Sequence, residues 1–284
     1  MTTFIPDEPR WRWLRARLPS RQTPEERERE AASTATLRQS VEDSDGCCGI
    51  SDVGLVRPGN EDAFFFSTER NLMIVADGLG GHAAGEVASA IAIDSICGVM
   101  LGEAGGTEPV STLIDRALAQ ADADVRAHGQ VAPEHAGLAT TIVVAVLRDN
   151  KLSLVHVGDV RAYLCRNGRL QRLTDDHTIV GAMLRDGLIG EDEARHHPAR
   201  NNVSRAVGAA QDVVAEHTSL LLEAGDVLLL CSDGLWDEVP HSTMAEILSD
   251  PSPALDLAMR LTDAALVGGG HDNVTALVYR HPHL

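Results

Sequence analysis

The sequence predicts an α+β fold in which antiparallel β-sheets are covered by helices. Apolar runs of strand length, separated by turn signals, follow one another without regular β-α-β units, which argues against a doubly wound parallel sheet. Helical segments come in two pairs that interrupt the blocks of strands. With 284 residues, 44% of them hydrophobic, the chain is long enough for one large domain with its own core.

The predicted domain opens with three apolar runs of strand length, GISDVG, DAFFFST and NLMIVAD, at residues 49–54, 62–68 and 71–77. Two helices are expected next, from about Gly85 to Met100 and from about Pro109 to His128. The second carries one apolar stripe at helical spacing, made of Val110, Leu113, Ile114, Ala117, Leu118, Ala121 and Val125. We interpret this stripe as core and not as a cofactor site.

Four further strands, at residues 140–147, 151–158, 161–166 and 169–173, are expected to form an antiparallel meander. Its turns would be Asp149-Asn150 and Asn167-Gly168, the second being a strong hairpin signal. Mixed helix-like and loop-like sequence then runs from 175 to 208. Residues 213–222 and 226–233 predict another hairpin around a turn from Glu223 to Asp226, and helices at 241–249 and 254–269 precede a last strand at 273–280.

Residues 1–45 differ from the rest and are predicted to be a mobile tail, which leaves 46–284 as the folded domain. The tail has four prolines, an arginine-rich stretch between 10 and 21, and the mixed charge run EERERE. Trp11, Leu14 and Leu18 share a helical spacing among the arginines, so a helix that docks on a partner or on a membrane surface is the alternative to plain disorder.

The composition restricts the classes of partner. The formal net charge is −18, and residues 31–284 carry 17 basic against 36 acidic side chains. This excess argues against a nucleic-acid-binding surface and leaves metal ions or basic partners as counter-charges, unless the acids only form a solvated surface. Five cysteines without a Cys-x-x-Cys pair indicate reduced thiols. Without an apolar run near 20 residues or a signal peptide, we expect a cytoplasmic protein with no transmembrane segment.

Aspartates at the ends of predicted strands point to chemistry. One such residue is ordinarily a turn former or a helix cap. Here there are five, several of them beside glycine: Asp62, Asp77, Asp159, Asp233 and Asp272. In the stretch VADGLGGHAAGEVAS, the carboxylate followed by closely spaced glycines suits a metal ion or a phosphate. Five carboxylates that converged at one rim would repel one another unless cations held them, and all-oxygen ligands select magnesium or manganese.

Eight segments together resemble the bacterial form of the metal-dependent Ser/Thr protein phosphatases of type 2C. In chain order they are SDVGLVRPGNEDAF, VADGLGGHAAGEVAS, LATT, VGDVRAYL, LTDDHT, HHPARNNVSRAVG, CSDGLWD and HDNVTALV, within residues 46–280. The resemblance implies a four-layer α-β-β-α sandwich of two antiparallel sheets flanked by helix pairs. It also implies a two-metal centre at one end of the packed sheets.

Carried over to the matching positions, the resemblance assigns the core metal ligands. Asp77 would bridge both ions, and the carbonyl of Gly78 would complete the first site. Asp233 and Asp272 would hold the second ion, and Asp62 would bind metal or orient a metal-bound water.

Other positions receive less specific roles from the same resemblance. Glu61 is a further metal-site candidate, and Asp159 would hold a third, weaker ion, together with Asp237. Arg57 matches the arginine that clamps the substrate phosphate, although a plain surface arginine is the alternative. His82 is either a proton donor or a structural histidine at a helix start.

The implied reaction is hydrolysis of phosphoserine or phosphothreonine in proteins by a metal-activated water, with Mn²⁺ or Mg²⁺ as two core ions and a third beside them. The expected partners are phosphoproteins, including a Ser/Thr protein kinase, and the protein is expected to be a monomer. The alternatives are a partner-specific regulatory phosphatase of the sigma-factor switch type and a non-catalytic binding relative. The chain departs from the family at Val160, where serine is usual, and at Ala139, where glycine is usual. Asp175, Asp176 and His177 are interpreted as caps and turn residues.

Overall fold

A computed structural model describes residues 39–43, 46–80, 83–102, 108–132, 135, 137–209 and 213–282. The chain divides after Leu37, and every described residue lies in the C-terminal part. The predicted mobile tail and its alternative docking helix therefore lie outside the described residues and stay predictions.

Two sheets form the centre of the fold, and every strand pair within them is antiparallel. Sheet A has the order β1-β2-β11-β10-β7-β8, with strands at Gln39–Asp43, Cys47–Asp52, Val274–Arg280, Val227–Cys231, Arg161–Arg166 and Arg169–Arg172. Sheet B has the order β3-β4-β5-β6-β9, with strands at Asp62–Ser67, Leu72–Leu79, Ala139–Arg148, Lys151–Val157 and Glu216–Leu221. The predicted antiparallel arrangement is confirmed.

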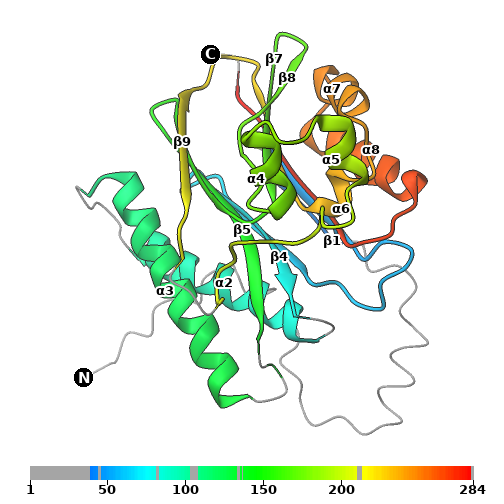
Figure 1. Ribbon diagram of the computed structural model, residues 1–284. Helices are drawn as coiled ribbons and strands as arrows, with labels where there is room; N and C mark the ends of the chain where they lie inside the picture. The colour runs from blue at the N-terminus through cyan, green and yellow to red at the C-terminus, as the bar shows by residue number, and fades with distance from the viewer. Residues whose placement is uncertain are drawn as a thin grey trace, which may run out of the picture. The chain divides into compact units, whose positions relative to one another are not determined.

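Helix pairs cover the outer faces of the two sheets (Figure 1). Sheet B is covered by α2 (Ala83–Gly102) and α3 (Val110–Val131), and sheet A by α7 (His241–Ser249) and α8 (Ala254–Gly268). Three short helices, α4 (Ile179–Arg185), α5 (Glu191–His196) and α6 (Asp233–Trp236), lie in the connections. The four-layer α-β-β-α sandwich expected from the resemblance is therefore present.

Alternation along the strands separates an inter-sheet core from the core beneath the helices. In β10, Leu228 and Leu230 pack between the sheets, while Val227 and Leu229 pack toward α7 and α8. Side chains two residues apart share a face of a strand, so an apolar strand can supply two different cores at once. The same rule later decides which polar side chains meet at the strand ends.

Two predicted strand pairings are wrong, although the strands themselves are present. The expected meander is split, because β5 and β6 belong to sheet B whereas β7 and β8 belong to sheet A. Likewise β9 pairs with β6 and β10 pairs with β7 and β11, so they are not a hairpin. Strands that are buried on both faces give no alternating pattern, and sequence neighbours then look like partners even where the chain changes sheet.

The two predicted tight turns are confirmed. Asn167 and Gly168, between β7 and β8, have φ angles of 51° and 75°, and Asp149 and Asn150, between β5 and β6, have 49° and 62°. Positive φ at both central residues gives the turn a twist that matches the flanking strands, and asparagine, aspartate and glycine tolerate it best.

The first strand was not anticipated from the sequence. β1 (Gln39–Asp43) pairs with β2, with Gln39 opposite Ser51 and Asp43 opposite Cys47. The predicted boundary at residue 45 therefore falls inside a hairpin, and a truncation that spares sheet A has to stop at or before residue 38.

Among the described residues, one helix is long and apolar enough to cross a membrane by length and composition alone, although no apolar run near that length was expected from the sequence. It is α2, whose segment Ala84–Gly102 has a mean hydropathy of 1.5, and 44% of that window is buried inside the fold. This helix packs on α3, β4 and β5, so we assign it to the core beneath the helices.

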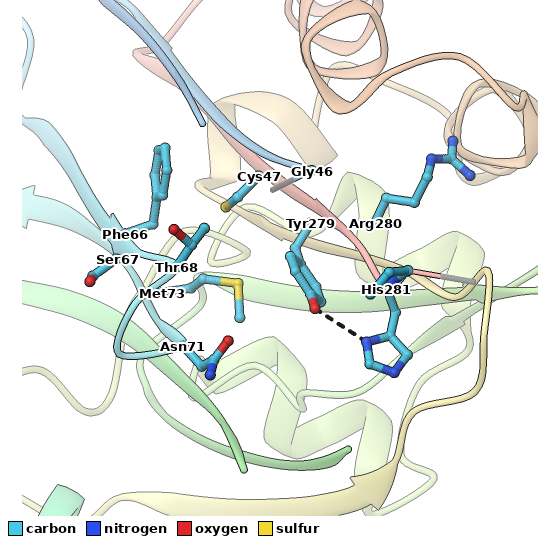
Figure 2. A pocket seen from close by; sticks show the side chains of 11 residues that line it. Gly46, Cys47, Phe66, Ser67, Thr68, Asn71, Met73, Tyr279, Arg280 and His281 are labelled. Atoms are coloured by element: carbon cyan, nitrogen blue, oxygen red, sulfur yellow. Dashed lines mark hydrogen bonds between the residues drawn. The ribbon is translucent and has the colours of Figure 1, made fainter. Parts of the chain in front are cut away.

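A pocket of about 610 Å³ opens between the sheets at one end of the sandwich (Figure 2). Met73, near the start of β4, and Tyr279, near the end of β11, line it, and the Tyr279 hydroxyl lies 3.2 Å from His281 Nδ1. Asp77 lies near the other end of β4, and Asp272 lies just before the other end of β11. The pocket is therefore remote from the predicted metal centre and contains none of its residues.

Candidate metal centre

The predicted site residues lie where strands end and where the chain passes from one sheet to the other. The connection from β2 to β3 carries Arg57 and Glu61, and the connection from β6 to β7 carries Asp159. Antiparallel packing brings these crossings to the same rim as the end of β4 and the start of β11. This geometry gathers side chains that are far apart in the sequence.

Asp62 and Asp77 are directly opposite each other in the register of β3 and β4. Two residues further into the sheet, Phe64 opposes Val75, and both pack in the inter-sheet core. Because side chains two apart share a face, both carboxylates continue the inter-sheet face out to its rim. The predicted pair at the strand ends is confirmed as a spatial pair.

Asp62 is tied to the opposite sheet by two hydroxyl groups. Ser232 Oγ and Thr275 Oγ1 both donate to Asp62 Oδ2, at 2.6 and 2.7 Å. Ser232 and Thr275 follow the inter-sheet alternation of Leu230 in β10 and Leu277 in β11. The carboxylate is therefore oriented by sheet A although it belongs to sheet B.

Asp233 and Asp272 are brought together by the packing of α6 on the start of β11. A Cβ atom on Gly234 would lie 2.1 Å from the carbonyl oxygen of Asn273, so only glycine permits this approach. The carboxylates of Asp272 and Asp77 both interact electrostatically with Asp233, and Asp77 also shares a hydrogen bond with it. The three acids assigned to the core ions by resemblance are therefore one cluster.

Gly78 is required by a similar contact at the end of β4. A Cβ atom at this position would lie 2.1 Å from the carbonyl oxygen of Gly85, in the first turn of α2. The Gly78 amide donates to the carbonyl of Glu61 at 3.1 Å, which fixes this backbone against the β2–β3 connection. Gly78, directly after Asp77, thus serves close backbone approach beside the carboxylate, as the sequence indicated.

Arg57 reaches the cluster from an ordered connection. Asn273 donates from Nδ2 to the carbonyls of Val53 and Gly59 at 2.8 and 2.9 Å, and its Oδ1 accepts from the Glu61 amide at 2.8 Å. The loop between these carbonyls holds Arg57, whose Nη2 lies 2.6 Å from Asp272 Oδ2 while 46% of the side chain stays exposed. Arg57 is therefore at the rim of the cluster and open to solvent.

Asp159 is buried, with 4% of its surface exposed, and its carbonyl accepts from Trp236 Nε1 at 3.0 Å. Trp236 belongs to α6, the helix that carries Asp233, so Asp159 lies beside the core cluster. The Arg161 guanidinium lies 3.4 Å from the centroid of the Trp236 ring and donates to both oxygens of Asp176, at 2.8 and 2.6 Å. Asp176 is thus the partner of a partly buried arginine, and not only the turn residue expected from the sequence.

The remaining candidates lie at the edge of the cluster or outside the description. Asp237 is exposed and lies 3.6 Å from Arg200 in an ion pair, although its charge still acts on Asp233. The Glu61 carboxylate lies against Gly85 at the start of α2. His82 lies outside the described residues, so neither of its predicted roles is tested.

Burial and mutual repulsion raise the pKa values of the clustered aspartates. Burial raises the pKa of Asp62 well above its ordinary value, against the two hydroxyl donors that lower it. Burial and then the charge of Asp62 do the same to the pKa of Asp77. The pKa of Asp159 is raised to about 8 by burial and by Asp233, and that of Asp233 to about 6 by burial and by Asp272. Ionised together, these groups need positive charge beside them.

The donor set fits divalent cations of the magnesium and manganese type. It consists of carboxylate oxygens and a backbone carbonyl, with neither a thiolate nor an imidazole among the assigned ligands. The Arg57 guanidinium makes an ion pair with Asp272, but one guanidinium does not balance five carboxylates. The raised pKa values and the all-oxygen chemistry agree on the same class of ion.

We expect the stability of the metal-free protein to fall as the pH rises from about 4 to about 8. In the unfolded chain these aspartates titrate near pH 4, whereas the folded-state pKa values of Asp233 and Asp159 are about 6 and about 8. Stability is then fully present below pH 4 and is lost as the pH rises through the folded-state values, because the unfolded chain releases protons that the folded protein keeps. Melting temperatures with a chelator from pH 4.5 to 8, measured by calorimetry, test this. Excess Mn²⁺ should remove the trend, and a rise in melting temperature over this range in the chelated protein would contradict it.

Sequence reasoning missed the side chains that orient the carboxylates. Ser232 and Thr275 donate to Asp62, and Asn273 fastens the Arg57 loop. A signal was present, because hydroxyl residues at inward positions of apolar strands, and an asparagine beside a site aspartate, are costly to bury without partners. Val160, where the family usually has serine, is fully buried in the inter-sheet core, which suits an apolar side chain.

Comparisons with known proteins agree with this geometry. A family model described as protein phosphatase 2C matches residues 58–261. The chain is 40% identical over 228 residues to the serine/threonine protein phosphatase PstP of Mycobacterium tuberculosis. The matched region covers 80% of this chain and 43% of PstP. It is 33% identical over 233 residues to the serine/threonine phosphatase stp of Listeria monocytogenes, covering 80% of this chain and 92% of that one. This chain thus spans less than half the length of the mycobacterial relative.

Solved structures give the same result in three dimensions. A crystal structure of M. tuberculosis PstP/Ppp matches with a TM-score of 0.77 and 39% identity, over 84% of this chain and 98% of that one. The catalytic domain of PstP in complex with two manganese ions matches with a TM-score of 0.75 and 37% identity, over 83% and 97% of the two chains.

Proposed function

Because this chain belongs to the protein phosphatase 2C family, we propose that it hydrolyses phosphoserine and phosphothreonine in proteins. The observation that carries the proposal is the convergence of five aspartates at one rim of the sandwich, with an exposed arginine beside them. A binding relative that had lost catalysis would be expected to lack one of these carboxylates, and all five are present.

We propose Mn²⁺ or Mg²⁺ as the cofactor, held by Asp77, Gly78, Asp233 and Asp272, with Asp159 beside them for a third ion. The relative PstP holds two manganese ions in its catalytic domain, which supports the choice of metal. When bound, such ions supply a nucleophilic water and neutralise charge on the phosphate.

The residues of this chain then have separable tasks. Asp62, held by Ser232 and Thr275, presents an oriented carboxylate oxygen toward the shared site. Arg57 supplies a planar pair of donors for phosphate oxygens at the open side, where its exposure leaves room for a protein substrate. Arg57 leaves Asp272 when it takes up this task, because a guanidinium in a phosphate clamp turns its donors to the substrate.

The proposed substrates are phosphoproteins, including a Ser/Thr protein kinase, and the proposed state is a monomer. The test of the activity is release of phosphate from a phosphothreonine peptide with Mn²⁺, with and without a chelator. We expect release that the chelator abolishes and that added Mn²⁺ restores. Equal release in the two samples would overturn the metal mechanism, and no release from phosphoserine and phosphothreonine peptides at saturating Mn²⁺ would overturn the proposed reaction.

Replacing Arg57 with alanine should weaken substrate binding and leave metal binding at least as strong as in the parent. The guanidinium contacts Asp272 at 2.6 Å, so its removal also removes a cation that competes for a proposed metal ligand. We expect KM for the peptide to rise about tenfold, a loss of about 1.4 kcal/mol, while the affinity for Mn²⁺ measured by calorimetry does not fall.

Arg57→Lys is the matched control for this prediction. It keeps the positive charge but loses the planar fork, so its KM should lie between those of the parent and the alanine variant. Weaker Mn²⁺ binding in Arg57→Ala would instead make Arg57 part of the metal centre.

A further inference from the structure

A second cluster of polar side chains lies beside the carboxylates, within the described part of the chain. His156 in β6, His177 after β8 and Glu216 in β9 place one ligand atom each within 4.8 Å of one another. Both histidines are buried, with exposed fractions of 0% and 2%. These three side chains could bind a metal ion, or they could form hydrogen bonds with neighbouring backbone groups. The two roles require different orientations of the histidine rings.

The ring geometry is unsuited to an ion. The His156 and His177 rings are stacked, with centroids 4.5 Å apart and planes 14° apart. Nitrogen lone pairs lie in the ring plane, so those of two stacked rings run side by side and do not converge on a common point. The guanidinium of Arg205 also lies 3.2 Å from His177 Nε2, where it would repel a cation.

His177 instead holds the backbone of one residue from both sides. Its amide donates to the Gly158 carbonyl at 2.9 Å, and its Nδ1 accepts from the Gly158 amide at 3.1 Å. An accepting Nδ1 places the proton of the neutral ring on Nε2. That proton can be donated only to Glu216 Oε2, at 3.3 Å, because Arg205 Nη1, at 3.2 Å, is itself a donor. Burial, and then His156, lower the pKa of His177 to about 4, which agrees with a neutral ring at neutral pH.

His156 helps to hold His177 and the residues before it in place. Its Nε2 lies 2.8 Å from the carbonyl of Asp175, two residues before His177 in the chain, and its ring stacks on His177. The contact anchors the segment that carries His177 to strand β6, whose next residues lead to Gly158.

Gly158 and Asp159 lie at a point where no strand ladder fixes them. β6 ends at Val157 in sheet B and β7 begins at Arg161 in sheet A, so the chain changes sheet between them. Gly158 has a φ of +104°, and a Cβ atom there would lie 2.3 Å from the Cβ of Thr141. The backbone polar groups of this crossing are bonded by His177 at Gly158 and by Trp236 at the Asp159 carbonyl.

We propose that His177 is a positioning residue of the metal centre, which fixes the Gly158–Asp159 crossing and through it the Asp159 carboxylate. His177 itself contacts neither substrate nor ion. The proposal rests on the metal role proposed for Asp159, and its tests are chosen so that part of the outcome does not depend on activity.

The variants separate the hydrogen-bond acceptor from the ring. His177→Phe keeps an aromatic ring for stacking on His156 but removes the acceptor for the Gly158 amide. His177→Asn loses the ring, but its Oδ1 stands at the same place along the side chain as Nδ1 and can accept that hydrogen bond. His217→Phe is the matched control, because His217 lies in β9 beside Glu216 but its side chain alternates to the other face of the strand, where it pairs with Asp115 of α3.

The first readout is hydrogen exchange of the Gly158 amide in the metal-free full chain, followed by NMR. We expect His177→Phe to speed exchange at Gly158 by at least about fivefold relative to the parent, with amides in the centre of β5 unchanged. His177→Asn should return the rate to within about twofold of the parent, and His217→Phe should not change it.

The second readout is the dependence of phosphatase activity on Mn²⁺. We expect the Mn²⁺ concentration for half-maximal turnover to rise at least about fivefold in His177→Phe, with two tightly bound ions still counted by calorimetry. If the parent lacks phosphatase activity, the proposed function fails while the exchange experiment still decides on the position of His177.

Three results would overturn the proposal. One is parent-like Gly158 exchange and Mn²⁺ dependence in His177→Phe. Another is an equal loss in the asparagine and phenylalanine variants, which would assign the effect to the ring. The third needs no variant: NMR of the parent at pH 7 should find His177 protonated at Nε2 and not at Nδ1, and a proton on Nδ1 excludes the proposed hydrogen bond.

Discussion

Turnover should fall at least about a hundredfold when Asp77, Asp233 or Asp272 is replaced by asparagine, a loss of about 2.7 kcal/mol in transition-state stabilisation. The three carboxylates form one cluster, so that loss of one charge affects every ion held there. Asparagine keeps the size and one oxygen of the side chain but removes the negative charge that a divalent cation needs. Phosphate release from a phosphothreonine peptide at saturating Mn²⁺ measures the effect.

Loss of the fold would give the same kinetic result, and stability measurements separate the two causes. Asp77 and Asp233 have raised pKa values in the metal-free protein, so their ionised forms are costly there. Asp77→Asn and Asp233→Asn should therefore be at least as stable as the parent in a chelator at pH 7.5, and all three asparagine variants should gain less stability from Mn²⁺. Asp149→Asn, at the exposed turn between β5 and β6, is the matched control and should behave like the parent. Near-normal turnover in a folded variant would remove that residue from the centre.

Replacing Asp159 with alanine should lower turnover more than about tenfold while two ions stay bound at the core site. The proposed ligands of those ions, Asp77, Gly78, Asp233 and Asp272, are untouched by this change. The hydrogen bond from Trp236 goes to the Asp159 backbone carbonyl and survives the substitution. Because a buried carboxyl with a pKa raised to about 8 is removed, the stability of the metal-free protein at pH 8 should not fall.

The competing interpretation of Asp159 is an ordinary turn residue. Turnover measured against Mn²⁺ concentration for parent and variant distinguishes the two, together with a count of bound ions in crystals grown at high Mn²⁺. Parent-like turnover of Asp159→Ala at every Mn²⁺ concentration would return Asp159 to the turn interpretation. Val160, the residue after Asp159 and the neighbouring departure from the family, is fully buried in the inter-sheet core.

Much of the fold was predictable because its signals are local. Helices α3, α7 and α8 follow apolar stripes at helical spacing, and the turns at Asp149-Asn150 and Asn167-Gly168 use residues that tolerate positive φ. The aspartates of the site were recognised for a similar reason, since each stands at the end of an apolar run and several adjoin a glycine. Local backbone and side-chain preferences are sufficient to place such features.

Pairing between the strands was not predictable from the same signals. β5, β6, β7 and β10 are buried along most of their length, so their sequences carry no alternation that would assign a face or a partner. The split of the expected meander, and the separation of β9 from β10, follow from how the two sheets pack on each other. β1 was missed because it lies in polar sequence and is a strand through its pairing with β2.

The sequence by itself determined ten of the eleven described strands, the two helix pairs, the two tight turns and the set of acids that could hold metal, because each depends on a few neighbouring residues. The tertiary structure alone decided which side chains orient those acids. Ser232 and Thr275 reach Asp62 across the space between the sheets, and His177 reaches Gly158 where the chain changes sheet. These hydrogen bonds form because a buried polar group without a partner is costly in free energy. The partners become available only after distant segments of the chain have packed together.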